Sequence, residues 1–276
     1  MLKKSAQRPA SMTLHNSFVG LILALGIAIT APPASTAPLA PTKTNPITRM
    51  IQQQIFNEPL VDEAAAAIPQ STSTRDLPSF TNKNLRVGIQ VGHFENENPP
   101  AELEWLKGNT GAYAAGKWEK EVAGAIAVRA RDILEKQGVV VDILPAVIPP
   151  GYKANAYVSV HTDGSDKNPK ANGFKVASSA KDRTGLANKL AAALDQAYEK
   201  ETGMRRDNNN ITRNMTHHYS FAYHKYEHAI SSRTPGALLE TGFLTNASDR
   251  KIIVDQPEIP ARALAYGILD FLEENF

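Results

Sequence analysis

Hydrophobic positions along the chain change their spacing at about Asn84. Beyond that residue, short runs rich in β-branched side chains alternate with segments whose apolar positions recur at helical spacing. The expected strands are Leu85–Val91, Val139–Leu144, Ala156–Val160, Phe174–Ala177 and Ala237–Glu240. Such alternation is typical of α/β layering, with a mainly parallel sheet between helices. We therefore expect one α/β domain over residues 84–276, with a mainly parallel central sheet of about six strands flanked by helices.

Amphipathic helices are expected between and after these strands. The first spans about Trp118–Gln137, and Gly138 supplies the left-handed residue that ends it. Two others span about Gly185–Lys200 and Ile259–Leu272. Asn246 is expected to cap a further helix, because its side chain can accept hydrogen bonds from the first helical N–H groups.

The first 37 residues have the order of an export signal. Lys3, Lys4 and Arg8 precede the apolar run Phe18–Ala31, and small residues with several prolines follow. The run is short for a membrane span. We expect residues 1–37 to be a signal peptide or an uncleaved N-terminal anchor, which predicts an exported protein that is periplasmic, wall-associated or extracellular.

Residues 38–83 are expected to be a linker. The segment begins with Pro, Ala and Thr, a composition that buries too little apolar surface to order itself. A stretch with some helical spacing, Ile47–Val61, is interrupted by Pro59, and Pro69 and a Ser/Thr run follow. One helix at most is predicted there.

The composition restricts the chemistry that the domain can carry. The chain has 276 residues and no cysteine, so disulfides, thiolate metal sites and cysteine nucleophiles are excluded. Histidine, aspartate and glutamate remain as metal ligands. The formal net charge is only +2 and no long basic block occurs, so the sequence gives no sign of a nucleic-acid-binding surface.

Residues that can bind a metal stand at the ends of three expected strands. They are His93, His161 and Glu240, and Glu119 lies in the first turn of the helix that follows the first strand. Open α/β sheets place their sites at the carboxyl ends of strands, so these four residues can converge at one rim. A catalytic zinc ion needs three protein ligands, an open position and a nearby carboxylate. The four residues supply the three ligands and the nearby carboxylate that such a site needs.

Each of these residues, taken alone, also has a structural interpretation. A single histidine after a strand is more often a packing residue than a ligand. Glu119 can simply stabilise the positive end of its helix. Glu240 follows an apolar run and, without a chemical role, needs a cation such as Arg233 beside it.

Together, four segments resemble the zinc-dependent N-acetylmuramoyl-L-alanine amidases, a family of cell-wall amidases of the amidase 3 type. The first three resemble the family's first strand with its Gly-His ligand, its Glu-Lys-Asp-Val helix start and its Ser-Ile-His segment. The fourth resembles the family's Pro-Ala-Val-Leu-Val-Glu-Leu-Gly-Phe-Leu-Ser-Asn and is the nearest of the four. In chain order, the segments are Val87–His93, Glu119–Val122, Val158–Asp163 and Pro235–Asn246.

The resemblance implies a fold, a reaction and a site. It implies one Zn²⁺ ion held by His93, Glu119 and His161, with Glu119 rather than Glu121 as the second ligand. It implies that Glu240 is the catalytic carboxylate. The implied substrate is peptidoglycan, cleaved at the amide bond between the muramic acid lactyl group and L-alanine.

Two segments depart from the family pattern. Phe94–Glu97 stands where the family has Gly-Gly after the first histidine, and Pro149–Tyr152 replaces a longer segment with Arg and Ala-Asn. We place both departures near the substrate rather than the metal. They leave open which amide bond is cleaved.

Other functions compete with this one. His224–His228 spells H-x-x-E-H, the inverted zinc-peptidase motif, so a zinc carboxypeptidase or peptidase on another amide is one alternative. A non-catalytic wall-binding module is another, although retention of all four site residues argues against it. His217 and His218 are expected either at the surface or beside the substrate, and the aromatic residues Tyr219, Phe221 and Tyr223 either in the core or in a cleft wall.

Overall fold

The computed structural model describes residues 75–168 and 170–276. The expected signal segment, residues 1–37, and residues 38–74 of the expected linker lie outside the described residues. Within the described ranges no helix has the length and apolar character needed to cross a membrane.

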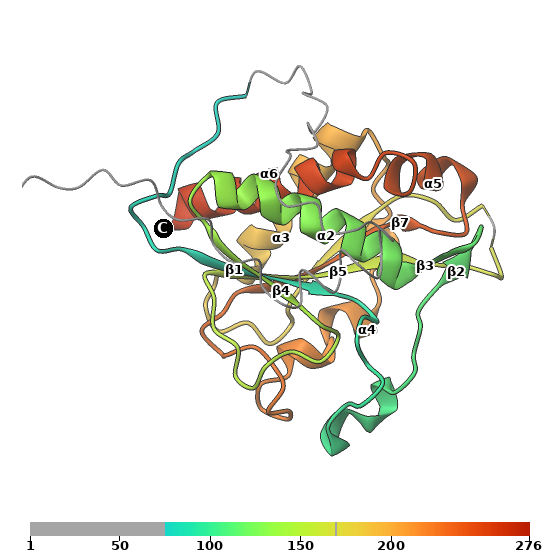
Figure 1. Cartoon of the computed structure of the whole chain (residues 1–276), viewed down its shortest axis with the longest axis horizontal. Coiled ribbons are helices and arrows are strands. Elements are labelled where there is room, and N and C mark those ends of the chain that lie inside the picture. The colour runs from blue at the N-terminus through green and yellow to red at the C-terminus, as the bar shows by residue number, and fades with distance from the viewer. Residues whose placement is uncertain (1–74, 169) are drawn as a thin grey trace, which may run out of the picture. The chain divides into compact units, whose positions relative to one another are not determined.

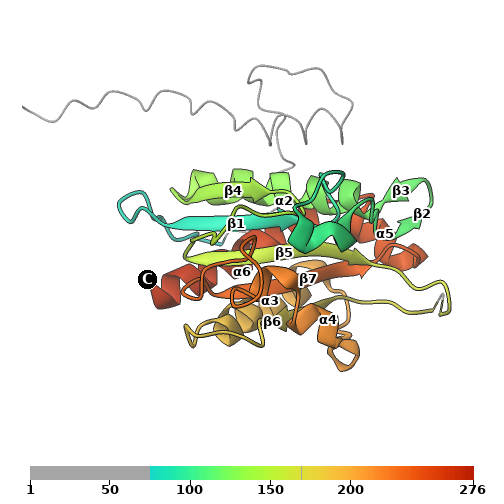
Figure 2. The same cartoon turned by 90° about the horizontal axis from the view of Figure 1, so that it is seen from below.

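A five-stranded sheet forms the centre of the described domain (Figure 1). Its strands lie in the order β4-β1-β5-β7-β6, which Figure 2 shows from one edge to the other. All neighbours are parallel except β6 and β7. The strands are β1 (Arg86–Val91), β4 (Val140–Leu144), β5 (Ala156–Asp163), β6 (Lys175–Ser178) and β7 (Gly236–Phe243). The α/β prediction with a mainly parallel sheet is confirmed.

Two further short strands lie outside this sheet. They are β2 (Tyr113–Ala114) and β3 (Lys117–Trp118), which pair antiparallel as a hairpin. The hairpin leads directly into the next helix, α2 (Glu119–Lys136). The sheet expected to have about six strands has five, and a separate hairpin lies beside it.

Three long helices cover one face of the sheet (Figure 1). They are α2, α3 (Ala187–Thr202) and α6 (Glu258–Asn275). The ends of these three helices lie within three residues of the predicted ends. Gly138 adopts φ 83° just after α2, and the Asn246 side chain accepts from the N–H groups of Ser248 and Asp249 at the start of α5 (Ala247–Ile253).

Loops and short helical turns cover the opposite face. These turns are η1 (Ala101–Leu106), η2 (Asn208–Asn210), α4 (Arg213–Thr216) and η3 (Tyr219–Phe221). Long polar connections of this kind are where α/β folds carry function.

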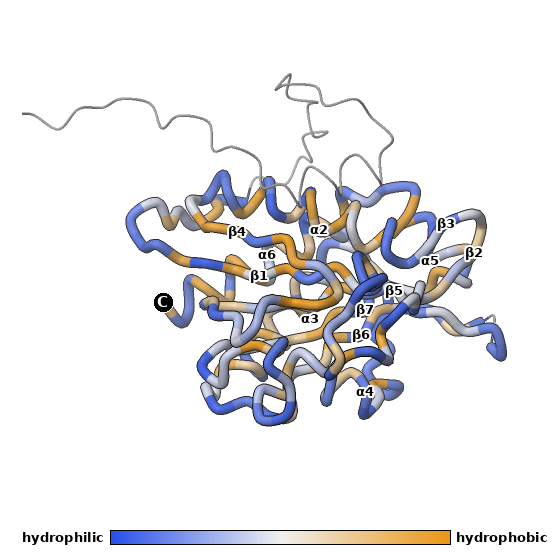
Figure 3. The backbone as a smooth tube through the Cα atoms, turned by 60° about the horizontal axis from the view of Figure 1, so that its bottom comes forward, coloured by the Kyte–Doolittle hydropathy of each residue, from blue (hydrophilic) through white to orange (hydrophobic). Residues whose placement is uncertain are grey.

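The alternation of side chains along the strands separates two hydrophobic clusters. Leu239 and Val158 lie in the cluster that the long helices cover, whereas Leu238 and Tyr157 lie in the cluster beneath the loops. Hydrophobic segments of the chain accordingly run through the middle of the domain in Figure 3. Because Glu240 is two residues from Leu238, its side chain is on the loop-covered face.

Residues just before the expected domain boundary pack on the domain. Phe80 is 2% exposed within the main core, and its N–H donates to the carbonyl of Gln137 at 2.7 Å. Arg75 forms an ion pair with Asp270. The boundary at Asn84 stays a prediction, and residues 75–83 add buried contacts to the domain that follows.

Candidate metal centre

His93 is held in an uncommon backbone conformation at the end of β1. It adopts φ 60°, a left-handed conformation that is rare for a residue other than glycine. Its Nδ1 lies 3.0 Å from the carbonyl oxygen of Asn109, which can only accept, so Nδ1 carries the proton and Nε2 has a free lone pair. Asn96 donates to the same carbonyl at 2.7 Å and fixes the loop. Such outer contacts are how proteins orient histidine ligands.

Glu119 begins α2 and is fixed by hydrogen bonds to both carboxylate oxygens. The N–H of Ala112 donates to Oε2 at 2.8 Å, and the N–H of Thr162 donates to Oε1 at 3.1 Å. Glu121, two residues later, instead accepts from the N–H of Trp118 and caps the helix. The structure thus places Glu119, and not Glu121, at the centre.

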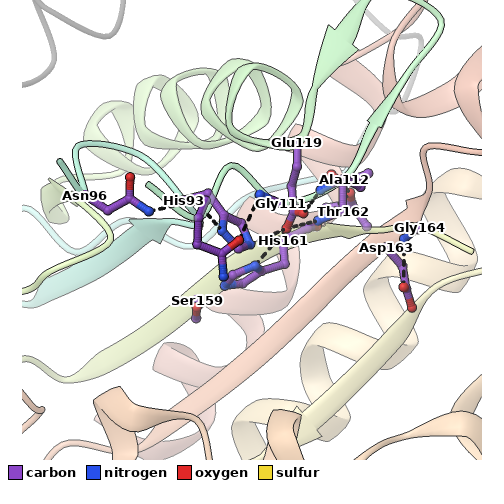
Figure 4. Close-up of polar contacts among 12 residues, drawn as sticks. His93, Asn96, Gly111, Ala112, Glu119, Ser159, His161, Thr162, Asp163 and Gly164 are labelled. Carbon is purple, nitrogen blue, oxygen red and sulfur yellow. Dashed lines mark hydrogen bonds and ion pairs between the residues drawn. The ribbon is translucent and has the colours of Figure 1, made fainter. Parts of the chain in front are cut away.

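His161 lies on β5, two residues before the end of the strand, and brings the set together (Figure 4). Its Nδ1 is 2.8 Å from Oε1 of Glu119, and His93 Nε2 is 3.4 Å from the same oxygen. Donor atoms of the three residues all lie within 4.8 Å of one another. Zinc bonds of ~2.0–2.2 Å in a tetrahedron separate ligand atoms by ~3.3–3.6 Å, so the donor set fits zinc with small shifts.

Glu240 stands next to His161 on the neighbouring strand. The two residues are register partners between β5 and β7. Nε2 of His161 and Oε2 of Glu240 are both buried without a hydrogen-bond partner among the described residues. Unpaired buried polar atoms are rare and require an explanation, which a reacting water beside these two atoms can provide.

Two glycines leave room for these side chains. A Cβ atom on Gly92 would lie 2.4 Å from the His161 ring, and one on Gly111 would lie 2.3 Å from Oε2 of Glu119. Gly111 also has φ 70°. We did not identify either glycine as a site residue from the sequence, because the ring and the carboxylate that approach them come from other segments.

The electrostatic environment shifts the pKa values of Glu119 and Glu240 in opposite directions. Burial alone would raise the pKa of Glu119, but hydrogen bonds from His161 and His93, with their charges, hold it well below its ordinary value. Burial raises the pKa of Glu240 to about 8. The charge of His161 lowers this pKa, whereas the charges of Glu119 and Asp163 raise it. A cation bound beside Glu240 favours its charged form, in which the carboxylate can accept a proton.

Lys175 is a site neighbour that the sequence interpretation missed. It pairs in register with Glu240 on β6, and only 5% of its side chain is exposed. It forms an ion pair with Asp163 and lies 4.9 Å from the centre of the Phe243 ring. The available signal was a lysine inside a short apolar strand, where an unpaired charge is costly.

The centre opens into a cleft with two parts that share His93, His161 and Glu240. The narrow part has a volume of about 440 Å³ and the wide part about 760 Å³. His217 and His218 both line the wide part, as do Tyr219 and Phe221, whereas Tyr223 lines neither. His218 lies 5.6 Å from His161 between ring centroids, and burial lowers its pKa well below the ordinary value.

Residues 148–272 match the family model described as N-acetylmuramoyl-L-alanine amidase. This match supports the assignment of the chain to that family. The match supports an amidase activity on peptidoglycan. The matched range includes His161 and Glu240 and begins after His93 and Glu119.

Solved amidase structures share this fold. The N-acetylmuramoyl-L-alanine amidase from Clostridium difficile 630 is 18% identical, with a TM-score of 0.52, over 70% of this chain and 99% of that one. The amidase Ami1 from Mycobacterium smegmatis is 17% identical, with a TM-score of 0.50, over 69% of this chain and 98% of that one. No curated protein matches the chain in sequence.

The described residues do not support two of the competing interpretations, the H-x-x-E-H zinc motif and the pairing of Glu240 with Arg233. His224–His228 forms turns rather than the helix that the inverted zinc motif requires, and His228 bonds to Glu102. Arg233 is exposed and makes no ion pair with Glu240 within the described ranges.

The two departures from the family pattern do not both lie where we expected. Asn96, within Phe94–Glu97, lines the wide part of the cleft as expected, and it also donates to the Asn109 carbonyl that holds His93. Pro149–Tyr152 lines neither part of the cleft. Tyr152 packs against Gly88 and donates to Asp142, which binds this segment to the sheet.

Proposed function

We propose that the chain is a zinc-dependent N-acetylmuramoyl-L-alanine amidase. It cleaves the amide bond between the lactyl group of N-acetylmuramic acid and the L-alanine of the peptidoglycan stem peptide. One Zn²⁺ ion is held by His93, Glu119 and His161. The observation that carries the proposal is the convergence of these three donors beside Glu240, whose buried carboxylate oxygen lacks a partner among the described residues.

When bound, zinc supplies Lewis acidity that polarises a carbonyl and makes water more acidic. Glu240 acts as general base and takes a proton from the attacking water as its oxygen bonds to the lactyl carbon. Glu240 then gives this proton to the nitrogen as the C–N bond breaks. The products are a free lactyl carboxylate and a stem peptide with a free amino group.

The proposal places the protein outside the cytoplasm, where peptidoglycan lies. Residues 1–37 act as the signal peptide or as an anchor, residues 38–83 as a linker, and residues 84–276 as the catalytic domain. The basic, apolar and small-residue order of the first 37 residues supports this arrangement. The protein is then periplasmic, wall-associated or extracellular, and the membrane takes part only if the anchor is uncleaved.

The direct test is digestion of purified peptidoglycan followed by mass spectrometry of the new ends. We expect muramic acid with a free lactyl carboxylate and peptides that begin with L-alanine. Chelation of zinc abolishes both products, and added zinc restores them. New ends at another amide bond, within or at the end of the stem peptide, would establish the peptidase alternative instead.

A further inference from the structure

The charge of the cleft lining changes sign across the metal centre. The wide part is lined by Lys181, Arg213 and Lys225 together with three histidines of the 217–224 segment, and its one carboxylate is Glu240. The narrow part is lined by Asp166 and by Asp163, which pairs with Lys175, and by no lysine or arginine. A ligand that spans the cleft is therefore oriented by its own charges.

The three cations of the wide part are free to bind a ligand. In the described part of the chain none of them has an ion-pair partner, and Lys225 lies 4.6 Å from the centre of the Tyr226 ring. Elsewhere many arginines are paired. These are Arg75, Arg86, Arg131, Arg205, Arg206 and Arg262. Unpaired cations gathered in a cleft attract anions to it.

These cations come from different segments that the fold ties together. Arg213 begins α4, which lies on the loop-covered face of the sheet (Figure 1). The N–H of Ala180, next to Lys181, donates to the carbonyl of Thr216 at the end of α4 at 2.9 Å. The N–H of Lys225 donates to the carbonyl of Ala222 at 2.8 Å. The positive wall is therefore built on a fixed backbone.

We infer that this wall, Lys181, Arg213 and Lys225, binds a carboxylate of the peptide on the amine side of the scissile bond. The inference rests on the proposed function. The acyl side of that bond is an uncharged sugar, whereas the stem peptide carries carboxylates, so only the peptide matches a positive wall. The amidase thereby selects acidic stems over amidated ones and binds them in one direction.

The test uses two synthetic muramoyl peptides that are identical except that a stem carboxylate is free in one and a carboxamide in the other. The full chain is compared with the triple variant Lys181→Gln, Arg213→Gln, Lys225→Gln. Each exposed charge pair contributes a factor of about two to five in affinity. The triple variant should therefore raise KM for the acidic peptide about tenfold and leave KM for the amidated peptide unchanged. Lys200→Gln, an exposed lysine on α3, is the matched control and should change neither KM.

Binding of the two released stem peptides, measured by calorimetry at low and moderate salt, separates this inference from the proposed function. Tighter binding of the acidic peptide, lost in the triple variant, supports the subsite even if no peptide is hydrolysed. Hydrolysis of both substrates with equal KM, unchanged in the triple variant, overturns the subsite and leaves the amidase in place. An equal loss of binding affinity for both peptides in the triple variant also overturns the inference, because the wall would then not distinguish a carboxylate from an amide.

Discussion

Glu240 is the residue at which chemical and structural roles are most easily separated. Replacement by Gln keeps its shape but removes its ability to accept a proton. We predict that Glu240→Gln folds and binds zinc, while turnover falls by ~10²- to 10⁴-fold, as expected for loss of a general base. Zinc content, melting temperature and amidase rate are measured on one purified variant. Near wild-type turnover would remove Glu240 from the mechanism.

The ligand set is tested by zinc content. Replacement of His93, Glu119 or His161 by Ala removes a donor from a three-ligand site, and each variant should lose stoichiometric zinc. His224→Ala and His228→Ala are the matched controls, since both remove an imidazole outside the centre, and they should retain it. Zinc loss confined to the controls would move the site to the H-x-x-E-H segment.

At the scale of elements, the loop between η1 and β2 contains two glycines that form a matched pair. Gly108 and Gly111 have φ 66° and 70°, but a Cβ atom on Gly108 meets nothing within 4 Å, whereas one on Gly111 reaches Glu119. Alanine at either position costs ~1–2 kcal/mol of backbone strain. We predict that only Gly111→Ala also weakens zinc binding, by ~10- to 100-fold, as disturbed outer contacts do.

Zinc titration and thermal melting of the two variants distinguish strain from steric contact. Both should melt a few degrees below the parent, because ~1 kcal/mol corresponds to ~2–4 °C in a domain of this size. Equal zinc affinities for Gly108→Ala and Gly111→Ala would show that the loop can move away from Glu119 without cost.

At the scale of the whole molecule, the segment before the expected boundary contributes to stability. We predict that residues 84–276 fold alone, and that a fragment starting at residue 75 melts about 10 °C higher, because it retains Phe80 in the core. Loss of a buried phenylalanine side chain costs ~3–5 kcal/mol, and each kcal/mol shifts the melting temperature by ~2–4 °C. Phe80→Ala in the longer fragment should remove most of the difference, and equal melting of both fragments would contradict the role of Phe80.

Local patterns in the sequence were enough to locate most elements and the types of residue at their ends. The β-branched runs and helical spacing predicted five strands and the long helices, since these signals depend on near neighbours. The sequence also placed His93, His161 and Glu240 at strand ends and Glu119 at a helix start. Parallel strands share one carboxyl edge, so their convergence followed from local pattern and one topological rule.

Contacts between groups that are far apart in the chain depended on the fold. The Asn109 carbonyl that orients His93, the ion pair of Lys175 with Asp163 and the room left by Gly111 all join segments with no common local signal. The same holds for the positive wall of the cleft, whose residues come from α4 and two separate loops. Loop paths depend on packing against the sheet rather than on periodicity, so the sequence named the residues of the centre and the fold supplied their surroundings.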